Sequence, residues 1–161
     1  MENLSKKIVE NLKNKNETIS FMESCTGGFL ANEITNIDGA SSVLKISLVT
    51  YSNEYKIKFG VNKKTINQYS VYSIETANEM AEQISKFAES DWGIGVTGEL
   101  DYNSKDEVYY SIYNCKTQKF VNNSIIAEGN DREEKKEFVA KNVLGDLLKQ
   151  IDGGRRIYAG E

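Results

Sequence analysis

The chain has 161 residues and a mass of 18.1 kDa, the size of a single domain. Its composition, 39% hydrophobic and 27% charged, is that of a globular protein and excludes a disordered or membrane-spanning chain. The sequence has no histidine, which excludes Ser-His-Asp and Cys-His catalysis and imidazole metal ligation. Its net charge of −4 argues against nucleic acid or an anionic membrane as a partner, so we expect a small-molecule ligand.

Helices alternate with strands early in the chain, and a hairpin comes late. Apolar residues three or four positions apart predict the helices, and short β-prone runs predict the strands. In chain order the predicted elements are a helix over 4–12, a strand over 18–22, a helix over 29–34, a strand over 45–51, a short helix from Ser52 or Asn53 to Gly60, a helix over 74–88 capped by Ser73, a strand over 92–97, a hairpin of strands 107–114 and 119–127, and a helix from Asn130 or Asp131 to Ile151.

This order predicts an α/β fold, a three-layer α/β/α sandwich with a mixed central sheet. Residues 1–152 are expected to form one domain, and residues 153–161 a flexible tail that begins at a Gly-Gly pair. In such folds ligands bind beyond the carboxyl ends of the strands. Three polar segments follow predicted strands, at residues 24–28, 51–56 and 97–98. They form the candidate site.

The first segment, Ser-Cys-Thr-Gly-Gly at 24–28, offers a hydroxyl and free backbone N–H groups at the start of a helix. Such a turn can hold an anion or an oxyanion. The alternative is structural: Ser24 or Thr26 caps the helix, and Gly27 and Gly28 permit close packing.

The second segment contains Lys56, which can activate a serine when its amine is neutral, as in Ser-Lys hydrolases. Lowering the pKa of a lysine from ~10.4 to near 7 requires burial or cationic neighbours. The alternative is a solvated surface lysine.

The two cysteines and the N-terminus indicate a reducing compartment. Cys25 and Cys115 are too few for a disulfide framework, and no Cys-x-x-Cys pair suggests a zinc site. Cys25 at a helix start could be a nucleophile, but without a histidine base we favour a packing role, and we expect Cys115 to be inert. The first seven residues lack the apolar segment of a signal peptide, so we expect a cytoplasmic protein.

An acidic stretch follows the predicted central strand. Its carboxylates could ligate a divalent ion through oxygen, but a solvated acidic loop is the interpretation we favour. The acidic residues are Glu99, Asp101, Asp106 and Glu107. We expect neither a metal nor a cofactor.

Four ordered motifs resemble the C-terminal domain family of the competence/damage-inducible protein CinA. They are Glu-Ser-Cys-Thr-Gly-Gly at 23–28, Val-Thr-Tyr-Ser-Asn-Glu-Tyr-Lys at 49–56, Gly-Val at 60–61 and Val-Thr-Gly at 96–98. Gly-Asn-Asp-Arg at 129–132 also resembles the Gly-Asp-Arg with which the family enters its last helix. The resemblance implies an amidase domain that hydrolyses the carboxamide of nicotinamide mononucleotide to nicotinic acid mononucleotide and ammonia.

The resemblance also implies roles for individual residues. It places the nucleophile at Ser24, the general base at Lys56, an orienting or relaying hydroxyl at Tyr51 and an oxyanion ligand at Thr97. The implied substrate-binding and oxyanion residues are Thr26, Gly27, Gly28 and Gly98. Because small α/β enzymes often form symmetric dimers, we expect a homodimer.

The chain departs from the family pattern after Gly98. The family typically continues with a Gly-Pro-Gly-Gly loop, whereas residues 99–106 here are acidic and contain no glycine. Glycine loops let the backbone approach a ligand closely. Two hypotheses therefore stand: an active amidase, or a divergent, catalytically impaired member that binds a nucleotide or a protein partner.

Overall fold

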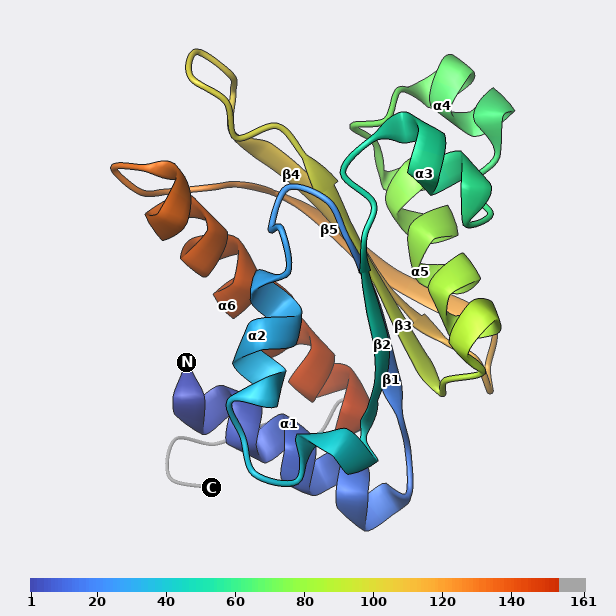
Figure 1. Cartoon of the computed structure of the whole chain (residues 1–161), viewed down its shortest axis with the longest axis vertical. Helices are drawn as coiled ribbons and strands as arrows, with labels where there is room; N and C mark the ends of the chain where they lie inside the picture. The colour runs from blue at the N-terminus through green and yellow to red at the C-terminus, as the bar shows by residue number, and fades with distance from the viewer. Residues whose placement is uncertain (154–161) are drawn as a thin grey trace.

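The computed structural model describes residues 1–153, in which a five-stranded mixed sheet lies between two layers of helices (Figure 1). The strands are β1 (Ile19–Glu23), β2 (Leu44–Val49), β3 (Trp92–Gly98), β4 (Glu107–Asn114) and β5 (Lys119–Ile126). The helices are α1 (Glu2–Lys15), α2 (Phe29–Thr35), the 3-10 turn η1 (Ala40–Ser42), α3 (Asn53–Lys58), α4 (Lys63–Tyr69), α5 (Ile74–Ala88) and α6 (Arg132–Ile151). The predicted three-layer α/β fold is confirmed. Most of the expected tail, residues 154–161, lies outside the described residues.

The sheet order, β2-β1-β3-β4-β5, places β1 between two parallel neighbours. Strands β4 and β5 complete the sheet as an antiparallel hairpin. Glu23, the last residue of β1, is level with Val49 of β2 and Val96 of β3. The three parallel strands therefore end together, and the segments that follow them meet at one edge of the sheet.

Each face of the sheet is covered by its own helices. Figure 1 shows α1, α2 and α6 on one face and α3, α4 and α5 on the other. The first face holds the larger apolar cluster, to which α6 contributes the stripe predicted from its spacing. The smaller cluster on the second face consists of Met22, Val61, Met80 and Ile84. Both faces bury apolar surface, so β1 and β3 are buried along their whole length.

Helix α5 packs unusually close to the centre of the sheet because β3 carries glycines beneath it. A methyl group added at Gly93 would lie 2.0 Å from the carbonyl oxygen of Ala81, and one at Gly95 would lie 2.5 Å from that of Ala77. Both contacts are with the backbone, which cannot rotate away. The glycines of β3 therefore set the distance between α5 and the sheet.

We expect Gly93→Ala to lower the free energy of unfolding by about 2 kcal/mol or more, because α5 must move away from β3. Gly145→Ala is the matched control, since a methyl group there meets nothing within 4 Å on α6. That control should stabilise the protein by about 0.5–1 kcal/mol through helix propensity. Urea titration of both variants gives the comparison, and equal stability of Gly93→Ala and the wild type would contradict the close packing.

Side-chain caps start three helices as the sequence predicts, with Asp131 rather than Asn130 capping α6. The capping oxygens belong to Ser52, Ser73 and Asp131, each of which accepts the backbone N–H of the residue three positions ahead. The sequence did not predict α4, which has a polar composition and no buried residue. The second strand ends at Val49 rather than at residue 51. No helix among residues 1–153 is long and apolar enough to cross a bilayer.

Candidate active site

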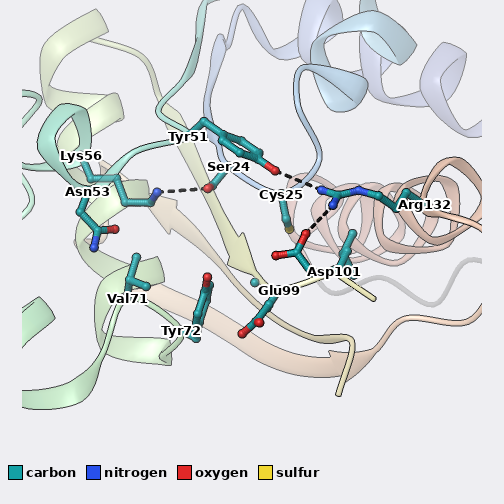
Figure 2. Close-up of a pocket in the computed structure, with 12 residues that line it drawn as sticks. Ser24, Cys25, Tyr51, Asn53, Lys56, Val71, Tyr72, Glu99, Asp101 and Arg132 are labelled. Atoms are coloured by element: carbon teal, nitrogen blue, oxygen red, sulfur yellow. Dashed lines mark hydrogen bonds and ion pairs between the residues drawn. The ribbon is translucent and has the colours of Figure 1, made fainter. Parts of the chain in front are cut away.

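A cavity of ≈ 110 Å³ lies where the three parallel strands end (Figure 2). It is lined by Ser24, Cys25, Tyr51, Asn53, Lys56, Val71, Tyr72, Gly98, Glu99, Leu100, Asp101 and Arg132. The three polar segments singled out in the sequence all contribute to it, as expected for the carboxyl end of a parallel sheet. The cavity is smaller than the ~300–1,000 Å³ of pockets that enclose a drug-sized ligand, so it can enclose only part of a ligand of that size.

Ser24 and Lys56 meet at the base of this cavity. Ser24 follows β1 directly, and its backbone N–H donates to the carbonyl of Val96 at 3.0 Å, which fixes the serine beside β3. The Lys56 amine lies 3.0 Å from Ser24 Oγ and donates to the carbonyl of Thr50 at 2.7 Å. Figure 2 shows the amine and the hydroxyl pointing toward each other. This is the separation that a nucleophile and its base require.

The orientation of α3 is opposite to that of an ordinary surface helix. Lys56 is its only buried residue, at 1% exposure, whereas the apolar Tyr55 and Ile57 are 48% and 36% exposed. Burying an amine costs free energy and exposing a tyrosine recovers none of it. Packing therefore does not explain the inward lysine, and the interpretation of Lys56 as a solvated surface residue is wrong.

Burial lowers the pKa of Lys56 from its ordinary value to about 8. Within residues 1–153 no carboxylate pairs with this amine, which would otherwise keep it charged. Relative to a solvated lysine, a drop of this size raises the neutral fraction near pH 7 roughly 300-fold. The amine can therefore accept a proton from Ser24 while it still donates to Thr50.

Glu23, a residue the sequence analysis did not select, holds the turn that carries Ser24. Its buried carboxylate accepts the N–H groups of Leu30 and Ala31 at 3.0 and 3.1 Å, in the first turn of α2. It also accepts the hydroxyls of Thr26 at 2.7 Å and Ser47 at 3.1 Å. The capping role considered for Ser24 or Thr26 thus belongs to Glu23, which leaves Ser24 Oγ to Lys56.

Backbone N–H groups remain available beside Ser24. In the part of the chain that the structure describes, the N–H groups of Thr26 and Gly28 have no hydrogen-bond partner, and that of Cys25 interacts only with its own thiol. The N–H of Gly27 is already donated to the carbonyl of Ser24 at 3.0 Å. Of these residues, Cys25 lines the cavity, and its N–H directly follows the hydroxyl. Donors in this position can stabilise an oxyanion formed on a group that Ser24 attacks.

The thiol of Cys25 is not a competing nucleophile. Cys25 is 3% exposed, and burial raises its pKa to about 12, so the thiol stays protonated at neutral pH. Cys115 is exposed at the far end of β4, outside the residues that line the cavity. The packing interpretation of Cys25 agrees with this environment.

Tyr51 lies at the mouth of the cavity rather than beside the lysine. Its hydroxyl accepts a hydrogen bond from Arg132 at 3.0 Å, and Arg132 also forms an ion pair with Asp101 (Figure 2). Lys56 is not a hydrogen-bond partner of Tyr51 among the described residues. The Tyr51 hydroxyl is therefore hydrogen-bonded to Arg132 and is not placed to relay a proton to Lys56.

Thr97 does not line the cavity, contrary to its expected contact with an oxyanion. It is fully buried, and its hydroxyl donates to the carbonyl of Val71 at 3.0 Å. Val71 and Tyr72 form one wall of the cavity, so Thr97 positions that wall. Gly98 lines the cavity as expected, whereas Thr26, Gly27 and Gly28 lie outside the lining residues.

A sequence model of the CinA C-terminal domain matches residues 1–151. The chain belongs to the CinA C-terminal domain family. A CinA-like protein of Kosmotoga olearia is 44% identical over 98 residues, which is 60% of this chain and 24% of that protein. A CinA-like protein of Endomicrobium trichonymphae is 50% identical over 88 residues, or 54% of this chain and 20% of that protein. The chain thus matches a quarter or less of the length of these CinA relatives.

Solved CinA-family structures share the fold over nearly the whole chain. The competence/damage inducible protein CihA from Agrobacterium tumefaciens has a TM-score of 0.86 at 24% identity and covers 94% of each chain. A CinA superfamily protein from Klebsiella pneumoniae 700603 has a TM-score of 0.87 at 20% identity and covers 94% of this chain and 98% of its own. At these identities the likeness establishes the CinA fold alone.

Two residues that shape the site escaped the sequence analysis although each left a local signal. Glu23 is a charged residue at the end of a strand that is buried throughout, a position where a carboxylate needs several donors. Arg132 is a cation in the first turn of α6, the end that favours anions. Each residue is unfavourable in its local context and is explained by a contact made elsewhere in the fold.

Proposed function

We propose that this CinA-family domain is an amidase that hydrolyses the carboxamide of nicotinamide mononucleotide. The observation that carries the proposal is the buried Lys56 amine, 3.0 Å from Ser24 Oγ. The lysine has no packing reason to face inward, and its lowered pKa suits a general base at neutral pH.

In the first half of the reaction, neutral Lys56 takes the proton of Ser24 as Oγ attacks the amide carbon. The new C–O bond turns the carbonyl oxygen into an oxyanion, which the N–H of Cys25 and the neighbouring turn would stabilise. The C–N bond then breaks, and the Lys56 ammonium returns the proton to the departing nitrogen, which leaves as ammonia.

In the second half, water hydrolyses the ester on Ser24. Lys56, neutral again, takes a proton from the water as its oxygen attacks the ester carbon. The bond to Ser24 Oγ breaks, Lys56 returns the proton to the serine, and nicotinic acid mononucleotide leaves as the carboxylate after its acid proton passes to solvent. One buried amine thus serves both steps without histidine or a metal ligand.

The surroundings of the dyad suit a flat cationic ring. Tyr72 and Glu99 line the cavity opposite Ser24, as Figure 2 shows. An aromatic face and a carboxylate both attract the positive charge of a pyridinium. A substrate bound in this way would place the ring and its carboxamide in the enclosed volume of ≈ 110 Å³ and its ribose phosphate at the open mouth.

The direct test is release of ammonia by the purified chain from nicotinamide mononucleotide, with free nicotinamide and glutamine as comparison amides. We expect turnover of the mononucleotide above that of both comparison amides. Folded protein that releases no ammonia but is stabilised by the mononucleotide would instead favour the divergent, nucleotide-binding alternative.

The rate should depend on pH through Lys56. Because the neutral amine is the active form and its pKa is about 8, kcat/KM should rise roughly tenfold between pH 7 and pH 9 and then level off. Initial rates between pH 6 and 10, corrected for a blank without enzyme, give the profile. A profile that is flat across this range, or that falls with increasing pH, would contradict a lysine base.

A further inference from the structure

Two cations lie on the first turns of α6, and one of them, Arg132, lines the cavity. Arg132 lines the mouth and bonds to Tyr51. Lys136 lies one helical turn later, and a methyl group added at Gly27 would lie 3.4 Å from its amine. Among residues 1–153, Lys136 has no ion-pair or hydrogen-bond partner. Of the two cations, Arg132 is the one at the mouth, where the substrate tail would emerge.

One of these cations, Arg132, already forms an ion pair with a carboxylate of the chain itself. Asp101 pairs with Arg132, and both side chains are largely exposed, at 62% and 46%. A second pair, between Asp106 and Lys135, anchors the same loop to α6. The loop, residues 99–106, is the acidic stretch that stands where the family has glycines. Its Asp101 carboxylate therefore lies where an anionic group of a ligand would meet Arg132.

We propose that Asp101 competes with the substrate phosphate for Arg132, and so sets the preference of this site for a phosphorylated over an unphosphorylated pyridinium amide. This inference rests on the proposed amidase function. A phosphate accepts hydrogen bonds from an arginine as a carboxylate does and carries more charge, so it can replace Asp101.

The size of the effect follows from the exposure of the pair. Exposed ion pairs are weak, so the phosphate displaces Asp101 at a small cost in affinity. Removing the Asp101 carboxylate ends its competition for Arg132 and its repulsion of the substrate phosphate. We expect Asp101→Asn to lower KM for nicotinamide mononucleotide about fivefold with kcat unchanged. KM for the same nucleoside without its phosphate should not change.

Asp106→Asn is the matched control, because it removes the same charge from the same loop but from a pair that lies outside the cavity. Its backbone φ of 56° also suits asparagine. This variant should leave both KM values as in the wild type. Arg132→Gln should raise KM for the nucleotide and leave KM for the nucleoside unchanged.

Thermal stabilisation by inorganic phosphate tests the same inference without turnover. Asp101→Asn should be stabilised at lower phosphate concentrations than the wild type or Asp106→Asn, and Arg132→Gln should not be stabilised. Equal phosphate responses, or a change in KM shared by nucleotide and nucleoside, would overturn the role of Asp101. If no substrate released ammonia, the amidase proposal would fail. The measurement with inorganic phosphate would still decide whether Asp101 competes with phosphate for Arg132.

Discussion

Lys56→Met is expected to lower ammonia release at least ~10³-fold, because no other described residue beside Ser24 Oγ can take its proton. Ser24→Ala should lower it to a similar extent. The double variant should be no worse than either single one, since the two residues act as a unit. Ammonia release under saturating nicotinamide mononucleotide measures all three.

Two controls accompany this prediction: a check that the variant folds, and the same substitution at a lysine away from Ser24. Methionine matches the length of lysine and avoids burying an amine, so Lys56→Met should keep the far-ultraviolet circular dichroism of the wild type. Lys58→Met, on the exposed side of α3, should keep full activity because the Lys58 amine contacts Glu54 and the ring of Tyr55, both at the surface and outside the Ser24–Lys56 pair. A Lys56→Met variant that is folded and retains more than about a tenth of the activity would refute the lysine base.

Glu23→Ala is expected to lower the free energy of unfolding by about 3–5 kcal/mol. The substitution leaves four donors without an acceptor, two of them backbone N–H groups of α2. Buried donors that lose their partner carry the full desolvation cost. The same variant should lose activity, because the turn that places Ser24 loses its anchor.

Glu82→Ala provides the comparison, since within residues 1–153 the ion pair of Glu82 is an i,i+4 pair with Lys86 on the surface of α5. That substitution should change the unfolding free energy by less than about 0.5 kcal/mol. Chemical denaturation of both variants, followed by tryptophan fluorescence, gives the difference. A Glu23→Ala variant as stable as Glu82→Ala would show that the four contacts contribute nothing net.

Much of the architecture could be predicted because it depends on local signals. The four-residue spacing of Leu4, Ile8 and Leu12 and the caps at Ser52 and Ser73 act within a few residues. Helix α4 was missed for the same reason, because its polar sequence has no periodic apolar stripe. The resemblance to CinA supplied the pairing of Ser24 with Lys56, which local patterns could not.

The sequence by itself determined the chemical repertoire of this domain. Lacking histidine, it leaves serine and lysine as the natural nucleophile and base, and its α/β alternation places them at strand ends. Tertiary structure decided which groups act and in what state. Lys56 reaches Ser24 across 32 positions in the sequence, and Arg132 reaches Asp101 and Tyr51 across 31 and 81. Burial, which lowers the pKa of one amine among many, exists only once these distant segments pack together.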